Sequence, residues 1–184
     1  MSNVGIVDYG LCNLDSVYRA VEECSGKPFI VDNPKDFSDF DHIIIPGVGS
    51  FSDAMKNLEK QGLIDLICEE AIVNKTPILG ICLGMQLLAS LGTEIEEKKG
   101  LNLIEGVILR LEPAKTNERI PHIGWNEVNF KNPSELLLGI DSGSDFYFVH
   151  SYYFDCHEEY KIATTPYANN FPSVVGKDNV FGVQ

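Results

Sequence analysis

The sequence predicts an α/β fold, namely a doubly wound, mostly parallel sheet with an antiparallel extension in the C-terminal half. Strand-like and helix-like segments alternate through the first half with short loops between them, which is typical of parallel strands joined by crossover helices. After Gly92 the chain changes to short strand-like pieces that turn signals separate. A length of 184 residues fits one domain, 1–184, that contains both halves.

The first half contains the segments that build the parallel sheet. Short apolar runs predict strands, and apolar residues at helical spacing predict the helices between them. The strands are expected at Asn3–Asp8, Phe29–Val31 and His42–Ile45, and the helices begin after Asn13, after Ser50 and near Ile64. Ser50 and Asp53 form a capping-box pattern, with Asp in place of Glu, which marks a helix start. The apolar stripe of the third helix comprises Ile64, Ile67, Cys68, Ala71 and Ile72.

The second half is expected to be mainly antiparallel and to remain in the same domain. Its predicted strands are Gly106–Leu111, Asn126–Phe130, Phe146–Val149, Tyr160–Thr164, Ser173–Val175 and Val180–Val183. The charged run Glu94–Lys99 between the halves is interpreted as a solvated surface segment.

The stretch from Pro77 to Leu88 carries the strongest chemical signal, because Gly80-x-Cys82-x-Gly84 stands where an apolar strand meets a helix-forming run. Glycines on both sides of a nucleophile are typical of the sharp elbow of α/β hydrolytic sites. Such an elbow exposes the Cys82 sulfur at the carboxyl edge of the sheet, beside a helix at Met85–Leu91 whose N-terminus favours the thiolate. The Leu83 N–H could then stabilise an oxyanion. The alternative is a buried structural cysteine.

A second loop falls at the same edge of the sheet. Pro46-Gly47-Val48-Gly49 follows the third strand directly, and ligands of doubly wound sheets bind at the carboxyl ends of the strands. Such a loop can point N–H groups at an anion or a carbonyl oxygen, although an ordinary tight turn has the same composition. For Pro121–Asn126 and His150–Phe154, a loop packed by its aromatic residues and a hydrogen-bonded structural histidine stay open as alternatives.

Composition excludes several classes of function. The net charge of −13 argues against nucleic acid and anionic membranes as partners. The sequence has no apolar run long enough to span a membrane and no N-terminal secretory signal. Its five cysteines lack metal-ligand spacing, so we expect reduced thiols, a cytoplasmic location and no metal site.

Five segments together resemble a known family. They are Asp8-Tyr9-Gly10 with Asn13-Leu14 and Ser16-Val17, Pro46–Gly49, Gly80–Gln86, Pro121–Asn126 and Tyr147–Tyr153. On these segments the chain resembles the class I, triad-type glutamine amidotransferases, and more narrowly the glutaminase subunits of imidazole glycerol phosphate synthase.

The resemblance implies a flavodoxin-like fold that hydrolyses glutamine to glutamate and ammonia without a cofactor. Cys82 would attack the side-chain amide of glutamine, and the backbone N–H groups of Leu83, Val48 and Gly49 would hold the oxyanion. The positions near bound glutamine would be Gly47, Gln86, His150, Ser151 and Tyr152.

The resemblance also implies a partner, a cyclase subunit that is a (β/α)8 barrel and forms a heterodimer with this chain. Asn13, Trp125 and Asn126 would face that barrel, through which ammonia passes to a ribulose-phosphate substrate. The oxyanion hole of such subunits is expected to be poorly formed without the partner. The cyclase products would be imidazole glycerol phosphate and an aminoimidazole carboxamide ribotide.

The chain departs from the family pattern at two places. Position 12 is Cys where the pattern has Gly, in a loop near the expected partner surface. The catalytic His and Glu of the family come in Val-Gln-x-His-Pro-Glu, whereas the sequence stops at Val183-Gln184. We therefore expect the 184-residue chain to be inactive or nearly so, and we expect an incomplete sequence rather than a natural inactive relative.

Three other functions fit parts of the sequence. One is a paralogous glutaminase subunit that feeds a sugar amidotransferase in surface polysaccharide synthesis. A second is a non-catalytic scaffold that only binds a partner, which the missing His and Glu favour and the elbow opposes. The third is the family of small stress proteins with an elbow cysteine, against which the Pro46–Gly49 and His150–Tyr153 segments argue.

Overall fold

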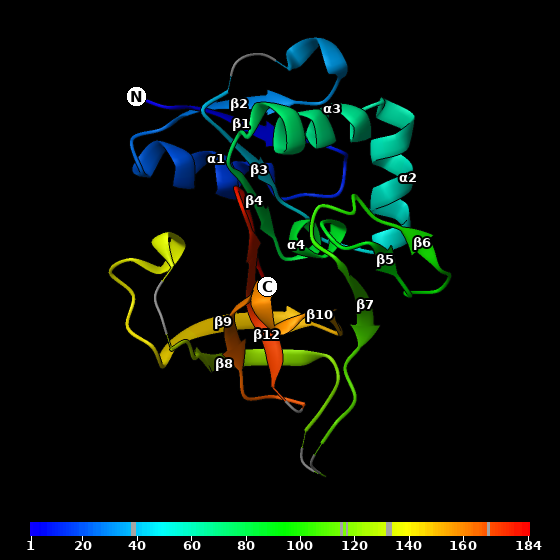
Figure 1. Cartoon of the computed structure of the whole chain (residues 1–184), viewed down its shortest axis with the longest axis vertical. Coiled ribbons are helices and arrows are strands. Elements are labelled where there is room, and N and C mark those ends of the chain that lie inside the picture. Colours follow the sequence, from blue (N-terminus) through cyan, green and yellow to red (C-terminus); the bar gives the residue numbers. More distant parts are fainter. Residues whose placement is uncertain (38–39, 115, 117, 132–133, 169) are drawn as a thin grey trace.

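A large sheet of parallel strands with two antiparallel strands at one edge organises the molecule (Figure 1). The computed structural model describes residues 1–184 except 38–39, 115, 117, 132–133 and 169. The strand order is β11 (Lys161–Thr165), β12 (Phe171–Lys177), β13 (Val180–Val183), β4 (Ile78–Ile81), β3 (His42–Ile45), β1 (Asn3–Val7) and β2 (Lys27–Val31). Strands β2, β1, β3, β4 and β13 are parallel neighbours, in the order of flavodoxin-like sheets. The predicted fold class is confirmed.

The helices cover the two faces of this sheet because successive residues of a strand point to opposite sides. They are α1 (Leu14–Glu23), α2 (Phe51–Gln61), α3 (Ile64–Glu69) and α4 (Leu83–Leu87), with short helical turns η1 (Pro34–Asp36), η2 (Glu70–Asn74), η3 (Glu135–Leu137) and η4 (Glu158–Tyr160). Ile43 and Ile45 of β3 belong to the main core, together with the buried residues of α2 and α3. Val4 and Ile6 of β1 pack instead with Val21 of α1, on the other face.

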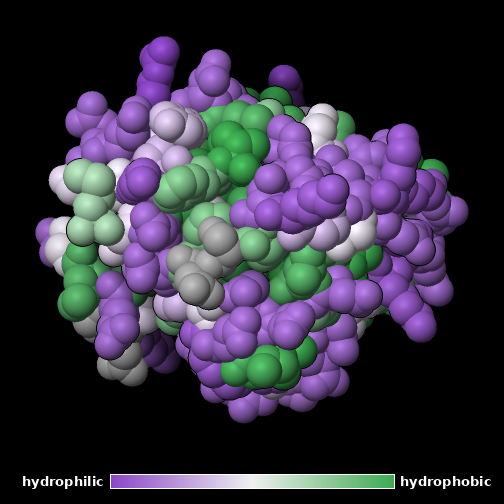
Figure 2. All heavy atoms as spheres, turned by 90° about the horizontal axis from the view of Figure 1, so that it is seen from above, coloured by the Kyte–Doolittle hydropathy of each residue, from purple (hydrophilic) through white to green (hydrophobic). Residues whose placement is uncertain are grey.

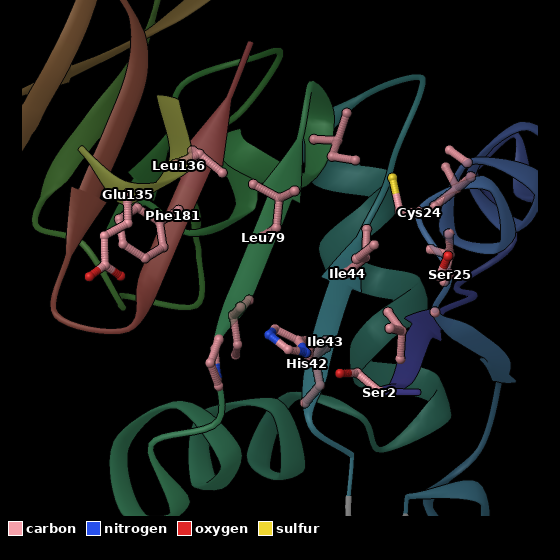
Figure 3. A pocket seen from close by; sticks show the side chains of 18 of the residues that line it. Ser2, Cys24, Ser25, His42, Ile43, Ile44, Leu79, Glu135, Leu136 and Phe181 are labelled. Carbon is pink, nitrogen blue, oxygen red and sulfur yellow. The ribbon is translucent and has the colours of Figure 1, made fainter. Parts of the chain in front are cut away.

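The face that α1 covers is partly open. Beside α1, a groove of about 660 Å³ runs along the apolar side chains of β3 and β4. Figure 3 shows Ile44 and Leu79 on neighbouring strands inside this groove, with Cys24 on one side and Leu136 and Phe181 on the other.

The C-terminal half adds two smaller sheets to the described part of the chain. Strands β10 (Tyr152–Cys156), β7 (Gly106–Arg110), β5 (Leu91–Gly92) and β6 (Lys98–Lys99) form one of them. Strands β8 (His122–Val128) and β9 (Ser144–His150) form an antiparallel ribbon. The expected antiparallel extension is therefore present, although two of its predicted strands form parallel pairs, β7 with β5 and β13 with β4.

The predicted helix at Met85–Leu91 is wrong. Helix α4 ends at Leu87, and Leu91 belongs to β5. The carbonyl oxygens of Leu87 and Leu88 accept hydrogen bonds from the N–H groups of Leu101 and Leu103, at 2.9 and 3.0 Å. These carbonyl groups are therefore satisfied by a distant segment, so a further helical turn is not needed to pair them.

The face that Figure 2 shows is mostly hydrophilic. The face in Figure 2 carries hydrophilic residues around its rim, and a band of hydrophobic residues crosses its middle. Within the described residues, no helix combines the length and the apolar character that crossing a membrane requires.

Candidate active site

The turn between β4 and α4 is the elbow that the glycines predict. Cys82 has φ +54° and ψ −111°, a conformation that residues with a side chain rarely adopt. A Cβ atom on Gly80 would lie 2.6 Å from the carbonyl oxygen of Gly84. A Cβ atom on Gly84 would collide with the carbonyl oxygen of Ile45 in the next strand. Both glycines are therefore required by close backbone contacts around Cys82.

The Cys82 thiol is half-buried, which corrects the expectation of an open sulfur with a lowered pKa. Burial raises the pKa of the Cys82 thiol above its ordinary value, and hydrogen bonds from the Leu83 N–H and the Gln184 side chain oppose this effect. Desolvation is the larger of these effects. The Leu83 N–H donates to the Cys82 sulfur and so lies next to the expected nucleophile, while its role toward an oxyanion stays a prediction.

The loop after β3 is held in place from two sides. The Tyr9 hydroxyl donates to the carbonyl oxygen of Pro46 at 2.6 Å, and a Cβ atom on Gly47 would collide with that hydroxyl. The Val48 N–H donates to the carbonyl oxygen of Leu11 at 2.8 Å. Gly49 has φ +108°, which favours glycine.

The bond to Leu11 corrects the predicted role of Val48 for this conformation. An N–H group that already has an acceptor does not point at an oxyanion beside Cys82. A predicted oxyanion donor is therefore engaged elsewhere, and the Val48 peptide would have to turn before it could contribute.

A cavity of about 470 Å³ joins the two loops to β9 and β10. Most of the predicted site residues line it, namely Val48, Gly49, Cys82, Leu83, Gln86, His150, Ser151 and Tyr152. Gln86 is buried at this cavity, and its Nε2 donates to the Tyr152 carbonyl oxygen at 3.3 Å and to Gln184 Oε1 at 2.9 Å. Gln184 Nε2 in turn lies 3.6 Å from Cys82 Sγ.

Sequence reasoning missed four residues of this site, which are Glu94, Pro121, Val149 and Gln184. Glu94 belongs to the charged run that was expected to be solvated, yet its carboxylate accepts a 2.8 Å hydrogen bond from the Phe51 N–H at the start of α2. The sequence holds no signal for this contact, because 43 residues separate its two partners.

His150 is not placed as a free base. Its Nδ1 lies 2.8 Å from the Tyr152 carbonyl oxygen, and its Nε2 lies 3.1 Å from Nδ1 of His122. Burial lowers the pKa of His150 to about 4, so the ring is neutral at pH 7. Both ring nitrogens are engaged. These contacts fit the alternative that His150 is a hydrogen-bonded structural histidine.

The predicted partner residues lie on two elements. Asn13 is exposed and immediately precedes α1, where its side chain makes no capping bond. Trp125 of β8 is 72% exposed and lies on the outer face of the ribbon with Ile123, Tyr147 and Val149. Asn126 points to the opposite, inner face and is half-buried there beside His122, so it is separated from Trp125 by the plane of the ribbon.

Within the described residues, no group of three or more His, Cys, Asp or Glu side chains is arranged to hold a metal ion. The thiols of Cys12, Cys24, Cys68, Cys82 and Cys156 are free. Cys12, the departure from the family pattern, lies 3.3 Å from the Asp8 carboxylate, and burial raises the pKa of its thiol to about 12.

The chain is similar to known proteins over almost its whole length. The family model "Glutamine amidotransferase class-I" matches residues 5–184. The imidazole glycerol phosphate synthase subunit HisH 1 of Campylobacter jejuni (strain RM1221) is 44% identical over 181 residues, which cover 98% of this chain and 90% of that protein. The subunit HisH of Lactococcus lactis is 43% identical and is covered to 90%.

Solved structures share the fold at lower identity. A structure titled "Crystal structure of glutamine amidotransferase" has a TM-score of 0.76 and 16% identity, and covers 98% of this chain and 87% of that chain. The structure of PurLQS from Thermotoga maritima has a TM-score of 0.75 and 20% identity, and the match covers 100% of this chain and 87% of that chain.

Proposed function

We propose, from the premise that this chain belongs to the class I glutamine amidotransferase family, that it is the glutaminase subunit of an imidazole glycerol phosphate synthase in histidine biosynthesis. The observation that carries the proposal is the elbow itself, which places Cys82 in a cavity shared with Gln86, Ser151 and Tyr152. The family model spans residues 5–184, which supports a single domain. The free cysteines are compatible with the cytoplasmic location that the sequence predicts.

The chemistry begins with the Cys82 thiolate, which attacks the side-chain amide carbon of glutamine. A C–S bond forms, and the oxyanion develops near the Leu83 N–H, which already lies at the sulfur. The C–N bond then breaks, and the leaving nitrogen takes a proton and departs as ammonia. Water adds to the thioester, the C–S bond breaks, and glutamate leaves.

Two of these steps require an acid–base group next to Cys82. Within the described part of the chain, the histidine that lines the cavity is His150, whose nitrogens are both engaged. The family pattern puts the base two residues after the Val-Gln pair, which here is Val183-Gln184. Gln184 touches the Cys82 sulfur, so residues attached after it would emerge beside the nucleophile.

The outer face of the ribbon supports the partner assignment. Ile123 pairs with Val149 and Trp125 pairs with Tyr147, and these four side chains are 56–72% exposed. Clustered exposed apolar side chains are typical of protein interfaces. We assign this face, with Asn13, to the cyclase barrel, where the lyase chemistry of the synthase would occur.

The Val48 contact supports control by that partner. The Leu11 carbonyl that accepts from Val48 lies in the loop that leads to Asn13. A partner that draws this loop away would release the Val48 N–H toward Cys82. Binding energy would then complete the oxyanion hole when the acceptor enzyme is present, which limits wasted ammonia.

The experiment compares glutamine hydrolysis by polypeptide 1–184 and by the same polypeptide extended with Phe-His-Pro-Glu, each with and without a cyclase barrel subunit. We expect little turnover from polypeptide 1–184, and restored turnover from the extended chain that the barrel increases further. General acid–base catalysis is worth about 10²–10⁴-fold. Full activity of polypeptide 1–184 would show that another residue supplies the base, and equal turnover without the barrel would contradict the coupling.

A further inference from the structure

The inner face of the β8–β9 ribbon holds two histidines opposite one another. His122 pairs with His150 in the register of the ribbon, and their exposed fractions are 3% and 6%. Asn126 lies on the same face of β8 because it follows His122 by four residues, an even number along a strand. The proposed chemistry assigns no role to His122, so this buried polar pair requires an explanation.

Aromatic side chains fix the orientation of both rings. His122 stacks on Tyr167 with ring centroids 3.9 Å apart and an interplanar angle of 19°, and it stacks on Phe148 at 5.1 Å. The ring of His150 meets Phe171 at 4.6 Å and 64°, in an edge-to-face arrangement. Rings held in this way present their nitrogens in fixed directions, so their hydrogen bonds define a single network.

The donor and acceptor roles in this network follow from its two ends. The Tyr152 carbonyl can accept a hydrogen bond but cannot donate one, so Nδ1 of His150 carries a proton. In a neutral ring Nε2 is then an acceptor, and Nδ1 of His122 must donate to it across 3.1 Å. Burial lowers the pKa of both histidines, which keeps the two rings neutral at pH 7.

The contacts at the Asn126 end of the network agree with the same tautomer of His122. With Nδ1 protonated, Nε2 of His122 is an acceptor, and Nδ2 of Asn126 lies 3.5 Å from it. The orientation of that amide is set by its oxygen, which accepts a 3.0 Å hydrogen bond from the Glu127 N–H. The amide nitrogen therefore faces His122 as a donor, and every proton in the chain from Asn126 to Tyr152 has one assignment.

This chain of hydrogen bonds ends beside the cavity that contains Cys82. The Tyr152 carbonyl that accepts from His150 also accepts from Gln86, at 3.3 Å. Gln86, Ser151 and Tyr152 line the cavity that contains Cys82. A shift of His150 would therefore move the backbone against which glutamine is proposed to bind.

We propose that His122 is a positioning residue of the glutamine site, which acts by donating from Nδ1 to Nε2 of His150 and so holds the Tyr152 carbonyl in place. Both rings are the Nδ1–H tautomer. The outer face of β8 carries Trp125, so a displacement of β8 by a partner would reach Tyr152 through the same pair. The positioning role rests on the proposed glutaminase function, whereas the tautomer assignment does not.

The tautomers are tested by nitrogen NMR of the imidazole rings in the ¹⁵N-labelled chain. Four histidines are present, so single His→Asn variants assign every ring signal. We expect His122 and His150 to be neutral at pH 7, protonated at Nδ1 and unprotonated at Nε2. An Nε2–H tautomer or a charged ring at either position would overturn the proposal whether or not the chain hydrolyses glutamine.

The positioning role is tested by two substitutions in the complete enzyme with its partner. His122→Asn keeps a donor near the place of Nδ1, whereas His122→Leu keeps an apolar group and removes the donor. We expect His122→Leu to raise KM for glutamine roughly tenfold with a smaller effect on kcat, and His122→Asn to restore most of the loss. Equal KM values for both variants and the wild type, or a loss confined to kcat, would overturn the role.

Where His122→Leu fails to fold, His122→Phe takes its place, because Phe keeps the stacking on Tyr167 and lacks the donor. Circular dichroism shows whether each variant is folded. A raised KM for His122→Phe beside a KM near the wild-type value for His122→Asn supports the positioning role, and a wild-type KM for His122→Phe would overturn it.

Discussion

The elbow around Cys82 and the β8–β9 ribbon both contribute to one cavity, but different forces hold them. Backbone groups that approach each other closely hold the elbow, since Gly84 lies against the Ile45 carbonyl. A backbone ladder joins the two strands of the ribbon, and side chains fix its inner face through the stacked ring of His122 and its hydrogen bond to His150. The elbow is therefore a rigid feature that tolerates no added atom, whereas the ribbon depends on the protonation and packing of particular rings.

The difference matches the roles proposed for the two regions. A nucleophile needs a fixed position, and steric contacts between backbone atoms provide one without any titratable group. A surface that receives a partner and passes the effect inward needs contacts that can rearrange, and hydrogen bonds between neutral rings can do so. Three predictions test this contrast, from the largest expected effect to the smallest.

Substitution of Gly84 by Ala tests the rigidity of the elbow. The new methyl group would collide with the Ile45 carbonyl, and neither backbone can move without distorting β3 or α4. We expect a loss of several kcal/mol in the free energy of unfolding, or no folded protein, measured by urea denaturation. Gly139→Ala is the control for an added methyl group without a collision, because Gly139 has open space around it, and its positive φ of +83° alone should cost about 1 kcal/mol. Equal costs would contradict a steric origin.

Acidification tests the neutral rings of the ribbon. The pKa of His150 in the folded chain is about 4, below its ordinary value of 6.5, so the unfolded chain binds a proton that the folded chain does not. The corresponding stability is fully present above pH 6.5 and is lost as the pH falls toward 4, by at most about 3 kcal/mol. Urea unfolding at pH 7 and pH 5 measures the loss, which we expect to shrink in His150→Asn and to persist in the exposed control His157→Gln. An unchanged pH dependence in His150→Asn would show that the ring is not held neutral.

Substitution of Trp125 by Ala tests the outer face of the ribbon. We expect affinity for a cyclase barrel to fall about tenfold or more, because exposed aromatic side chains often anchor interfaces. The stability of the chain itself should change by less than about 1 kcal/mol, since Trp125 is largely exposed. Titration of the barrel in a calorimeter provides the measurement. Tyr18→Ala on α1 is the control, and a similar loss of affinity for both variants would remove the special role of the ribbon.

The parts of the fold that depend on local sequence were predictable. The strands His42–Ile45 and Val180–Val183 have the predicted bounds, and Ser50 caps α2 by accepting from the Asp53 N–H. The elbow was predictable from Gly80, whose close contact is with Gly84 four residues later, whereas the close contact of Gly84 is with the distant Ile45.

The parts that depend on distant contacts were not predictable. Leu91 is in a strand rather than a helix because residues after Gly100 satisfy the last carbonyl groups of α4. The hydrogen bond between His122 and His150 depends on the register of β8 with β9, and the pKa of Cys82 depends on burial that neighbouring residues in sequence do not reveal. Ile72 shows the same limit, since it belongs to an apolar stripe and is nevertheless exposed.

The central claim is that the elbow makes Cys82 the nucleophile for glutamine. The most direct test is covalent labelling of this chain with a glutamine-mimicking diazo-ketone, followed by mass spectrometry of each cysteine-containing peptide. Burial raises the pKa of the Cys82, Cys68 and Cys156 thiols alike, so selective labelling of Cys82 would have to come from binding of the glutamine mimic in the cavity rather than from thiol acidity.

We predict a single label on Cys82 that excess glutamine suppresses, no label on Cys82→Ser, and unchanged labelling of the control Cys68→Ser. Label on Cys68 or Cys156 instead of Cys82, or labelling of Cys82 that glutamine does not slow, would contradict the account.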